Sequence, residues 1–255
     1  MRFFLMLFFV AMIISCTCNN NLDNTIGVKL NALTEQEIND GWELMFDGKT
    51  FDGWRGIGID SVPQGHWKIE NGCIRKIKSG DVPLRPDGQP LKGGDLLTDK
   101  LYKNFEFQFE WKISEGGNSG VKYNVDEQVS ISKGTSNALG FEYQVLDDSK
   151  NDDGVTPTHR SASLYDLFEA KDKILKPVGE FNSAKIIFNN NKGEHWLNGK
   201  KVVEYDLDSP EFNEAFKKSK YVNIENFTKH KIAHIVLQDH GSDCWYRNIK
   251  IKKLK

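Results

Sequence analysis

Gly140-Phe141-Glu142-Tyr143-Gln144-Val145-Leu146-Asp147 is the stretch of the sequence that indicates the fold most clearly. Two aromatic residues and a valine alternate with Glu142, Gln144 and Leu146, which is the period of a β-strand with two different faces. The apolar face can anchor a core, while the other face places a carboxylate and an amide about 7 Å apart. Because carboxylates on sheet faces are commonly solvated, this stretch alone leaves a structural and a functional interpretation equally open.

Further strand patterns follow along the chain. In residues 105–113, five apolar side chains alternate with polar ones, as in an antiparallel sheet with one buried face. Asn71-Gly72 separates two short strand-like runs and predicts a tight hairpin. A dozen such short strands predict an all-β domain, a β-sandwich or jelly roll of two antiparallel sheets. A curved outer sheet would leave a concave polar face, where small ligands bind on such folds.

Helical signals are few. Residues 34–37 read Thr-Glu-Gln-Glu, a capping box that predicts one short helical turn. Residues 209–218 predict one short helix late in the chain, with Ser209 as N-cap, Pro210 at the first helical position and lysines in the last turn.

The N-terminus predicts export. Met1-Arg2 precedes an apolar run at residues 3–14 that is typical of a secretory signal and too short for a membrane anchor. Ile13-Ile14-Ser15-Cys16 resembles the lipobox of bacterial lipoproteins, which implies cleavage before Cys16 and its acylation. An ordinary signal peptide with a chance cysteine is the alternative. We therefore expect a signal peptide (1–15), a flexible Asn-rich tether (16–34) and one domain (35–255).

This reading implies a lipid-anchored protein of the cell envelope, on the periplasmic or outer-membrane face of a Gram-negative-type bacterium. A formal net charge of −2, with no basic block beyond residues 250–255, predicts no nucleic-acid partner. Cys73 and Cys244 could pair in an oxidising compartment or remain buried thiols. Without a CxxC pair or a His/Cys cluster, we expect no metal site and no cofactor.

Several polar residues stand opposite the core-facing positions or at strand ends. Gln238 and His240 lie at even positions of a strand whose apolar Ile235 and Leu237 lie at odd positions, so the two pairs point to opposite faces. His195, beside Trp196, is expected to point to solvent. Each candidate has a structural alternative, such as a backbone partner for the amide, a turn, or a core position for the tyrosine. The candidates for a ligand-binding face are Glu142, Gln144, Asn118, Gln238, His240, Tyr165, Lys176, Asn182 and Asp147.

Several sequence blocks, in order over nearly the whole mature domain, resemble the 3-keto-disaccharide hydrolase domain family. The blocks are ELMFDG at 43–48, FDGW at 51–54, GNSGV at 117–121, GFEYQV at 140–145, LYD at 164–166, HWLNGK at 195–200, LQDHG at 237–241 and WYRNIKI at 245–251. The resemblance implies a concanavalin-like β-sandwich that acts on sugars oxidised at C3. Two departures are Phe181-Asn182, where the family usually has Trp-Asn, and Ser161-Ala162-Ser163, which lacks the family's common glycine.

A 3-keto sugar carries an acidified proton at C2, and its removal expels the substituent at C1. Such a site needs a base, a donor for the enolate and an acid for the leaving oxygen. We expect Glu142 to be the base, and His240, with Lys176 or Tyr165, to stabilise the enolate or protonate the leaving group. The substrate-binding residues would be Asn118, Gln144, Asp147, Asn182 and Gln238. Water addition to the unsaturated ketone would then complete a net hydrolysis.

Two alternatives remain open from the sequence. A conventional glycosidase of the laminarinase-like class would use two carboxylates about 5–9 Å apart, here Glu142 and Asp147 on one strand. A carbohydrate-binding lipoprotein without catalysis would use the same polar face only to hold a sugar.

Overall fold

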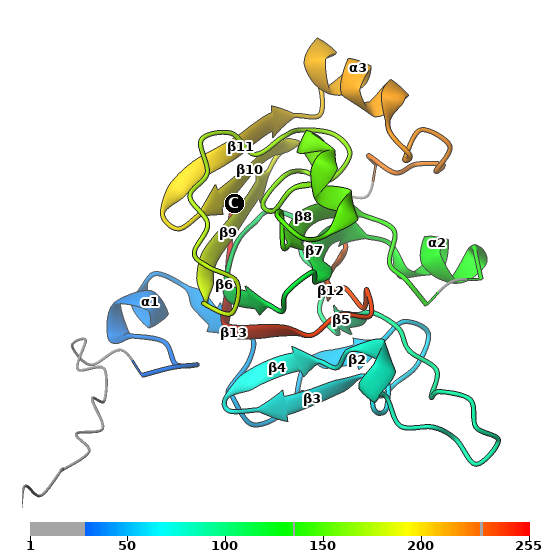
Figure 1. The fold of residues 1–255 in the computed structure, drawn as a ribbon. Coiled ribbons are helices and arrows are strands. Elements are labelled where there is room, and N and C mark those ends of the chain that lie inside the picture. Colours follow the sequence, from blue (N-terminus) through cyan, green and yellow to red (C-terminus); the bar gives the residue numbers. More distant parts are fainter. Residues whose placement is uncertain (1–28, 135, 230–231) are drawn as a thin grey trace, which may run out of the picture.

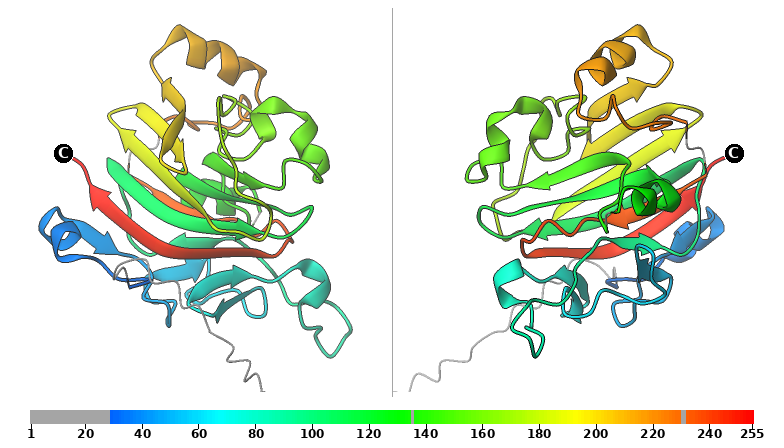
Figure 2. Two further views of the ribbon diagram at one scale, coloured as in Figure 1. Left: turned by 60° about the vertical axis from the view of Figure 1, so that its left-hand side comes forward. Right: turned by 90° about the vertical axis from the view of Figure 1, so that its right-hand side faces the viewer.

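The computed structural model describes residues 29–134, 136–229 and 232–255, which form two antiparallel β-sheets packed against each other (Figures 1 and 2). The predicted all-β sandwich is confirmed. The larger sheet has the strand order β11-β10-β9-β6-β13-β4-β3, and β1 also pairs with β13. Its strands are β1 (Trp42–Leu44), β3 (Trp67–Glu70), β4 (Cys73–Lys76), β6 (Phe105–Ile113), β9 (Asn182–Asn189), β10 (Lys192–Leu197), β11 (Lys200–Asp206) and β13 (Cys244–Lys253).

The smaller sheet has the order β2-β5-β12-β7-β8. Its strands are β2 (Trp54–Gly56), β5 (Leu96–Thr98), β7 (Asn118–Val125), β8 (Phe141–Leu146) and β12 (His234–Leu237). One face of this sheet packs on the larger sheet, and the other face carries three of the polar residues that the sequence singled out, Asn118, Glu142 and Gln144.

The core lies between the sheets. Along β6 the side chains alternate between buried and half-buried, as the sequence predicts. The ring of Phe109 on β6 meets the ring of Tyr143 on β8 edge to face, with centroids 5.5 Å apart. Each such buried side chain contributes about 1.5–3 kcal/mol, so this contact fixes which face of β8 points inward and which outward.

The Asn71-Gly72 hairpin joins β3 and β4, and both turn residues have positive φ (51° and 70°), as a type I′ turn requires. The late helix is confirmed as α3 (Pro210–Lys218), capped by Ser209. The early turn is confirmed as α1 (Glu35–Asn39), whose capping box joins Thr34 and Glu37.

The prediction of a single late helix is incomplete, because α2 (Glu127–Ser132) and three 3-10 turns are also present. These turns are η1 (Ser79–Asp81), η2 (Asp152–Val155) and η3 (Pro157–His159). Helix α2 is one and a half turns long, too short for a helical period in the sequence. Asp126 caps its N-terminus, and Arg55 binds Glu127 through two hydrogen bonds of 2.6 and 2.9 Å.

Contacts with the domain already begin before Glu35, at Asn31, whereas the predicted division into signal peptide, tether and domain stays a prediction. The amides of Asn31 and Asn248 bind each other's backbone reciprocally, at 2.8 Å in both directions, and Asn31 also donates to Gly72 O. This contact joins residues 217 positions apart, so no local pattern could predict it. The expected signal peptide, the rest of the tether and Cys16 lie outside the described residues.

Two further expectations are decided by burial. Cys73 and Cys244 are both buried and free, which agrees with the thiol alternative. His195 is fully buried, so the expectation that it points to solvent is wrong. Its Nδ1 donates to Ala162 O and its Nε2 accepts from the Tyr123 hydroxyl; burial lowers the pKa of His195 to about 4. In the described residues, no helix has the length and apolar character needed to cross a membrane.

Candidate active site

The outward face of the smaller sheet brings several predicted residues together. On β7 and β8, Lys122 pairs with Glu142, Gly120 with Gln144, and Asn118 with Leu146. Because directly paired residues share a face of the sheet, Glu142, Gln144 and Asn118 all point away from the core. Glu142 is only 3% exposed, so this carboxylate lies under other parts of the chain and not in bulk water.

Gly120 makes room for the Glu142 carboxylate. A Cβ atom at Gly120 would lie 2.3 Å from Glu142 Oε1, so the carboxylate folds back across β7 at the one position there without a side chain. The amide of Gln144, oriented to match its neighbours, donates to Glu142 Oε1 at 3.1 Å and lies 3.2 Å from the Asn118 amide. The side-chain amides of Asn118 and Gln144 therefore form a row that ends at one side of the Glu142 carboxylate.

A buried ammonium accompanies this carboxylate. Lys122 is 5% exposed, and its Nζ donates to Asp95 Oδ2 at 3.2 Å and to Ala138 O at 3.1 Å. Burial opposes the charge, but Asp95 and Glu142 outweigh it and hold the pKa of Lys122 above its ordinary value. Burial also raises the pKa of Glu142, against the opposing charges of Lys122 and Lys220. The site therefore pairs a fixed positive charge with a carboxylate of increased proton affinity.

The long loop between β8 and β9 covers the edge of β8 (Figure 1). Tyr165 N donates to Glu142 O at 3.0 Å, and Ser163 and Ala162 exchange backbone hydrogen bonds with Gln144. This pairing extends the sheet edge beyond β8 and places Tyr165 beside the Glu142 backbone.

The Tyr165 hydroxyl is already committed within this loop. It donates to Asp153 Oδ2 at 2.9 Å, and the ring stacks on His159 with centroids 4.2 Å apart. The two nitrogens of His159 face carboxylates, Asp153 at 2.7 Å and Asp166 at 3.1 Å. Burial and the Asp153 carboxylate raise the pKa of Tyr165, which makes its hydroxyl a poor proton donor.

Lys220 approaches the other side of this ring. Its backbone N–H donates to Asp166 Oδ2 at 2.6 Å, and its Nζ lies 3.9 Å from the centroid of Tyr165. The residue as a whole is exposed, whereas its ammonium end is enclosed closely enough that burial lowers the pKa of Lys220. No sequence pattern marks this lysine, because it follows α3 in an irregular segment.

Gln238 and His240 reach the site from β12. Gln238 N donates to Gly120 O at 2.9 Å, and its buried side-chain Oε1 has no hydrogen-bond partner among the described residues. His240 is exposed and borders a cavity of about 450 Å³. The residues that line this cavity are Ser79, Lys92, Gly93, Gly94, Ser136, Asn137, Asp239, His240 and Gly241.

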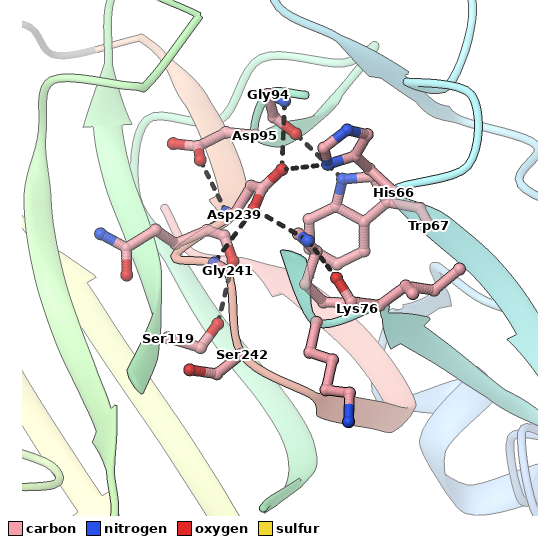
Figure 3. A network of polar contacts seen from close by, with 12 residues as sticks. His66, Trp67, Lys76, Gly94, Asp95, Ser119, Asp239, Gly241 and Ser242 are labelled. Atoms are coloured by element: carbon pink, nitrogen blue, oxygen red, sulfur yellow. Dashed lines mark hydrogen bonds and ion pairs between the residues drawn. The ribbon is translucent and has the colours of Figure 1, made fainter. Parts of the chain in front are cut away.

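A charged network holds the loop that carries Gln238 and His240 (Figure 3). Asp239 accepts from the fully buried Lys76 at 3.0 Å, from His66 Nδ1 at 3.0 Å and from Gly94 N at 3.2 Å. Asp239 N in turn donates to Asp95 Oδ1 at 2.7 Å. Since Asp95 also binds Lys122, one continuous set of contacts positions the loop relative to the buried ammonium.

Three predicted residues lie elsewhere. Asp147 is five residues beyond Glu142, about 16 Å along an extended strand, and its carboxylate binds Gly116 N and Ser149 Oγ. Lys176 N donates to Asn182 Oδ1 at 2.9 Å. Asp147, Lys176 and Asn182 line a separate cavity of about 200 Å³. The structure therefore does not bring them to Glu142, as the sequence interpretation assumed.

Metal ligands do not gather in the described part of the chain, where no group of three or more His, Cys, Asp or Glu residues could hold an ion. The expectation that the reaction needs no metal and no cofactor stays a prediction.

Comparisons with known proteins identify relatives of this chain. Residues 41–252 match the model of the family described as 3-keto-alpha-glucoside-1,2-lyase-like domain. A curated protein of Bacteroides thetaiotaomicron named 3-keto-disaccharide hydrolase is 39% identical over 235 residues, which cover 84% of this chain and 79% of the relative.

Solved structures point the same way. A protein of Parabacteroides distasonis classed among the glycosyl hydrolases superposes with a TM-score of 0.76 at 29% identity, covering 89% of this chain and all of that one. A second protein so classed from the same organism gives 0.63 at 26% identity, covering 84% of this chain and 99% of that one. With a family match over most of its length and a relative well above 30% identity, the chain belongs to the family of 3-keto-alpha-glucoside-1,2-lyase-like domains.

Proposed function

We propose that this chain is a hydrolase that cleaves the glycosidic bond of 3-keto-glycosides, with Glu142 as the base. The observation that carries the proposal is the Glu142 carboxylate, 3% exposed, held over Gly120 beside the permanently charged Lys122. The curated relative named 3-keto-disaccharide hydrolase supports the substrate class.

The first step is the transfer of the C2 proton to Glu142. The carbonyl at C3 acidifies this proton, and the electron pair of the C2–H bond forms an enolate whose charge falls on the C3 oxygen. Burial raises the pKa of Glu142, which makes it a stronger base than an exposed glutamate. Lys122 carries the fixed positive charge that stabilises the new anion, since Asp95 and Ala138 O prevent its ammonium from moving away.

The second step breaks the bond between C1 and the glycosidic oxygen. The enolate electrons form the C1–C2 double bond, and the leaving oxygen takes a proton from an acid. Water then adds at C1, and Glu142 returns its proton to C2, so the net reaction is hydrolysis. Gln144, Asn118 and the unpartnered amide oxygen of Gln238 would bind ring hydroxyls, and His240 would donate to the oxygen at C3.

The two-carboxylate alternative receives no support from the geometry. It requires carboxyl groups about 5–9.5 Å apart, whereas Asp147 lies about 16 Å along the strand from Glu142 and is bound to Gly116 and Ser149. A glycosidase of that class would also cleave unoxidised sugars, which the present proposal excludes.

The test is incubation of the purified protein with 3-keto-trehalose and with trehalose, each with and without a chelator, followed by product analysis. We expect cleavage of the oxidised sugar only, in both chelator conditions. Binding of either sugar without any product would favour the carbohydrate-binding alternative, and cleavage of trehalose itself would contradict the C2 mechanism. Activity lost with the chelator would show that a metal ion takes part.

We also propose export and lipid anchoring at Cys16, on the strength of the apolar run after Arg2 and the Ile13-Ile14-Ser15-Cys16 motif. The proposed reaction would then take place in the cell envelope. A Cys16→Ala variant should move from the membrane to the soluble fraction, and an unchanged distribution would contradict the anchor.

A further inference from the structure

Lys220 differs from the other cations around Glu142 in having no anionic partner. Among the described residues, no carboxylate lies within 4.0 Å of its Nζ, whereas Lys122 is bound to Asp95 and Lys76 to Asp239. Its ammonium lies instead over the ring of Tyr165, 3.9 Å from the centroid, and 5.2 Å from that of Tyr221. An ammonium held over an aromatic face, and not by a carboxylate, keeps protons available to a ligand.

The placement of Lys220 relative to Glu142 is fixed by two backbone contacts. Tyr165 N donates to Glu142 O, which ties the ring to β8, and Lys220 N donates to the carboxylate of Asp166, the next residue of the same loop. Of the charges around Lys220, that of Glu142 raises its pKa the most, and Lys220 in turn lowers the pKa of Glu142. The charges of the two side chains therefore act on each other, although their elements are far apart in sequence.

We propose that Lys220 is the general acid that protonates the leaving glycosidic oxygen. This inference rests on the proposed function and names the residue for a step that the mechanism leaves without a donor. As the C1–O bond breaks, its electron pair goes to the leaving oxygen, and a proton of the Lys220 ammonium forms the new O–H bond. In the hydration step the neutral amine accepts a proton from the water that attacks C1, which restores the ammonium.

The alternatives among the neighbours are less suited to this step. The Tyr165 hydroxyl donates to Asp153, and burial raises its pKa. Lys122 is held charged by Asp95 and Glu142, which raise its pKa. Lys176 lies at the other cavity. Desolvation of its ammonium lowers the pKa of Lys220, so its proton is released more easily than that of an ordinary lysine.

The experiment compares two leaving groups in the wild type and in Lys220→Met. The sugar alkoxide released from 3-keto-trehalose needs a proton as it leaves, whereas 4-nitrophenolate from the 4-nitrophenyl 3-keto-α-glucoside leaves as a stable anion. A general acid contributes about 10²–10⁴-fold. We therefore expect kcat of Lys220→Met to fall by at least about 10²-fold with 3-keto-trehalose and by far less with the nitrophenyl substrate.

Two further variants separate acid catalysis from charge and from structure. Lys220→Arg keeps a cation over the ring but is not deprotonated in proteins, so it should be as impaired as Lys220→Met with 3-keto-trehalose. Lys218→Met, an exposed lysine of the last turn of α3, is the matched control and should behave as the wild type. Thermal unfolding of each variant checks that the domain is intact.

Equal losses with both leaving groups in Lys220→Met, or an active Lys220→Arg, would overturn the assignment and leave Lys220 as an electrostatic or structural residue. A wild type that cleaves neither substrate would instead refute the proposed function itself. A wrong assignment of Lys220 would thus be seen in the variants, and a wrong proposed function in the wild type.

Discussion

The network around Asp239 allows a prediction with a defined size. In Asp239→Asn, Lys76 loses the carboxylate 3.0 Å from its Nζ and keeps only the backbone oxygen of Ile77. Lys76 is fully buried, so its charge has no access to water. Removing one partner of a buried pair costs about 3–5 kcal/mol. The new amide group would also face donors, because Asp239 Oδ2 accepts from both His66 Nδ1 and Gly94 N.

For a domain of this size, 1 kcal/mol corresponds to about 2–4 °C in Tm. Taking the lower end of the range, a loss of about 3 kcal/mol, we expect Asp239→Asn to lower Tm by about 6–12 °C at neutral pH. Scanning calorimetry measures Tm, and guanidinium unfolding measures the free energy. The double variant Lys76→Met/Asp239→Asn removes both charges and should recover part of the loss. Glu214→Gln, which breaks an exposed pair with Lys217, is the control and should unfold with the wild type.

A free energy of unfolding for Asp239→Asn within 1 kcal/mol of the wild type would refute this reasoning about the buried pair. Equal losses in the single and double variants would show that the loss does not come from the unpaired charge of Lys76. Because the same contacts position Gln238 and His240, we also expect kcat/KM for the 3-keto substrate to fall in Asp239→Asn at temperatures where the variant is fully folded.

Three further predictions concern the site itself. In Gly120→Ala, the new Cβ would lie 2.3 Å from Glu142 Oε1 and displace the carboxylate, so kcat should fall at least about 10-fold with little change in Tm. Gly80→Ala, with open space around the new Cβ, is the control. A fully active Gly120→Ala would contradict the placement of Glu142. Glu142 must be ionised to act as the base, and burial raises its pKa above the ordinary 4.5. We therefore expect kcat/KM to decline as the pH falls through a value above 4.5. A flat pH profile down to 4.5 would contradict this expectation. Tyr165→Phe removes the hydrogen bond to Asp153, worth about 1 kcal/mol of stability, but should keep kcat within about threefold of the wild type. A fall in kcat near 10²-fold would instead make Tyr165 the general acid for the leaving oxygen.

The alternation of residues in β8 predicted that Glu142 and Gln144 face away from the core, and similar alternation in the other strands predicted the all-β fold. The same alternation in β7 places Lys122 on the polar face, so this residue could have been found from the sequence. The separation of Asp147 from Glu142 also follows from strand spacing alone. By contrast, Lys220 lies in an irregular segment that has no period, and its position depends on tertiary contacts with the Tyr165 loop.

The segment at residues 161–163 contains one residue with an unusual backbone conformation. Ala162 is fully buried and has φ of 66°, a conformation that glycine adopts without strain and other residues rarely do. Its carbonyl accepts from His195 and its N–H donates to Gln144 O, so these two contacts hold the conformation at the edge of β8.

Replacement of the buried carboxylate of β8 by its isosteric amide is the most direct test of how this site works. Glu142→Gln preserves the shape over Gly120 and removes only the capacity to accept the proton at C2. With 3-keto-trehalose as substrate, kcat should drop by at least about 10²-fold while Tm stays at or above that of the wild type, because the desolvated charge is gone. Turnover of Glu142→Gln close to that of the wild type would show that another group removes the proton.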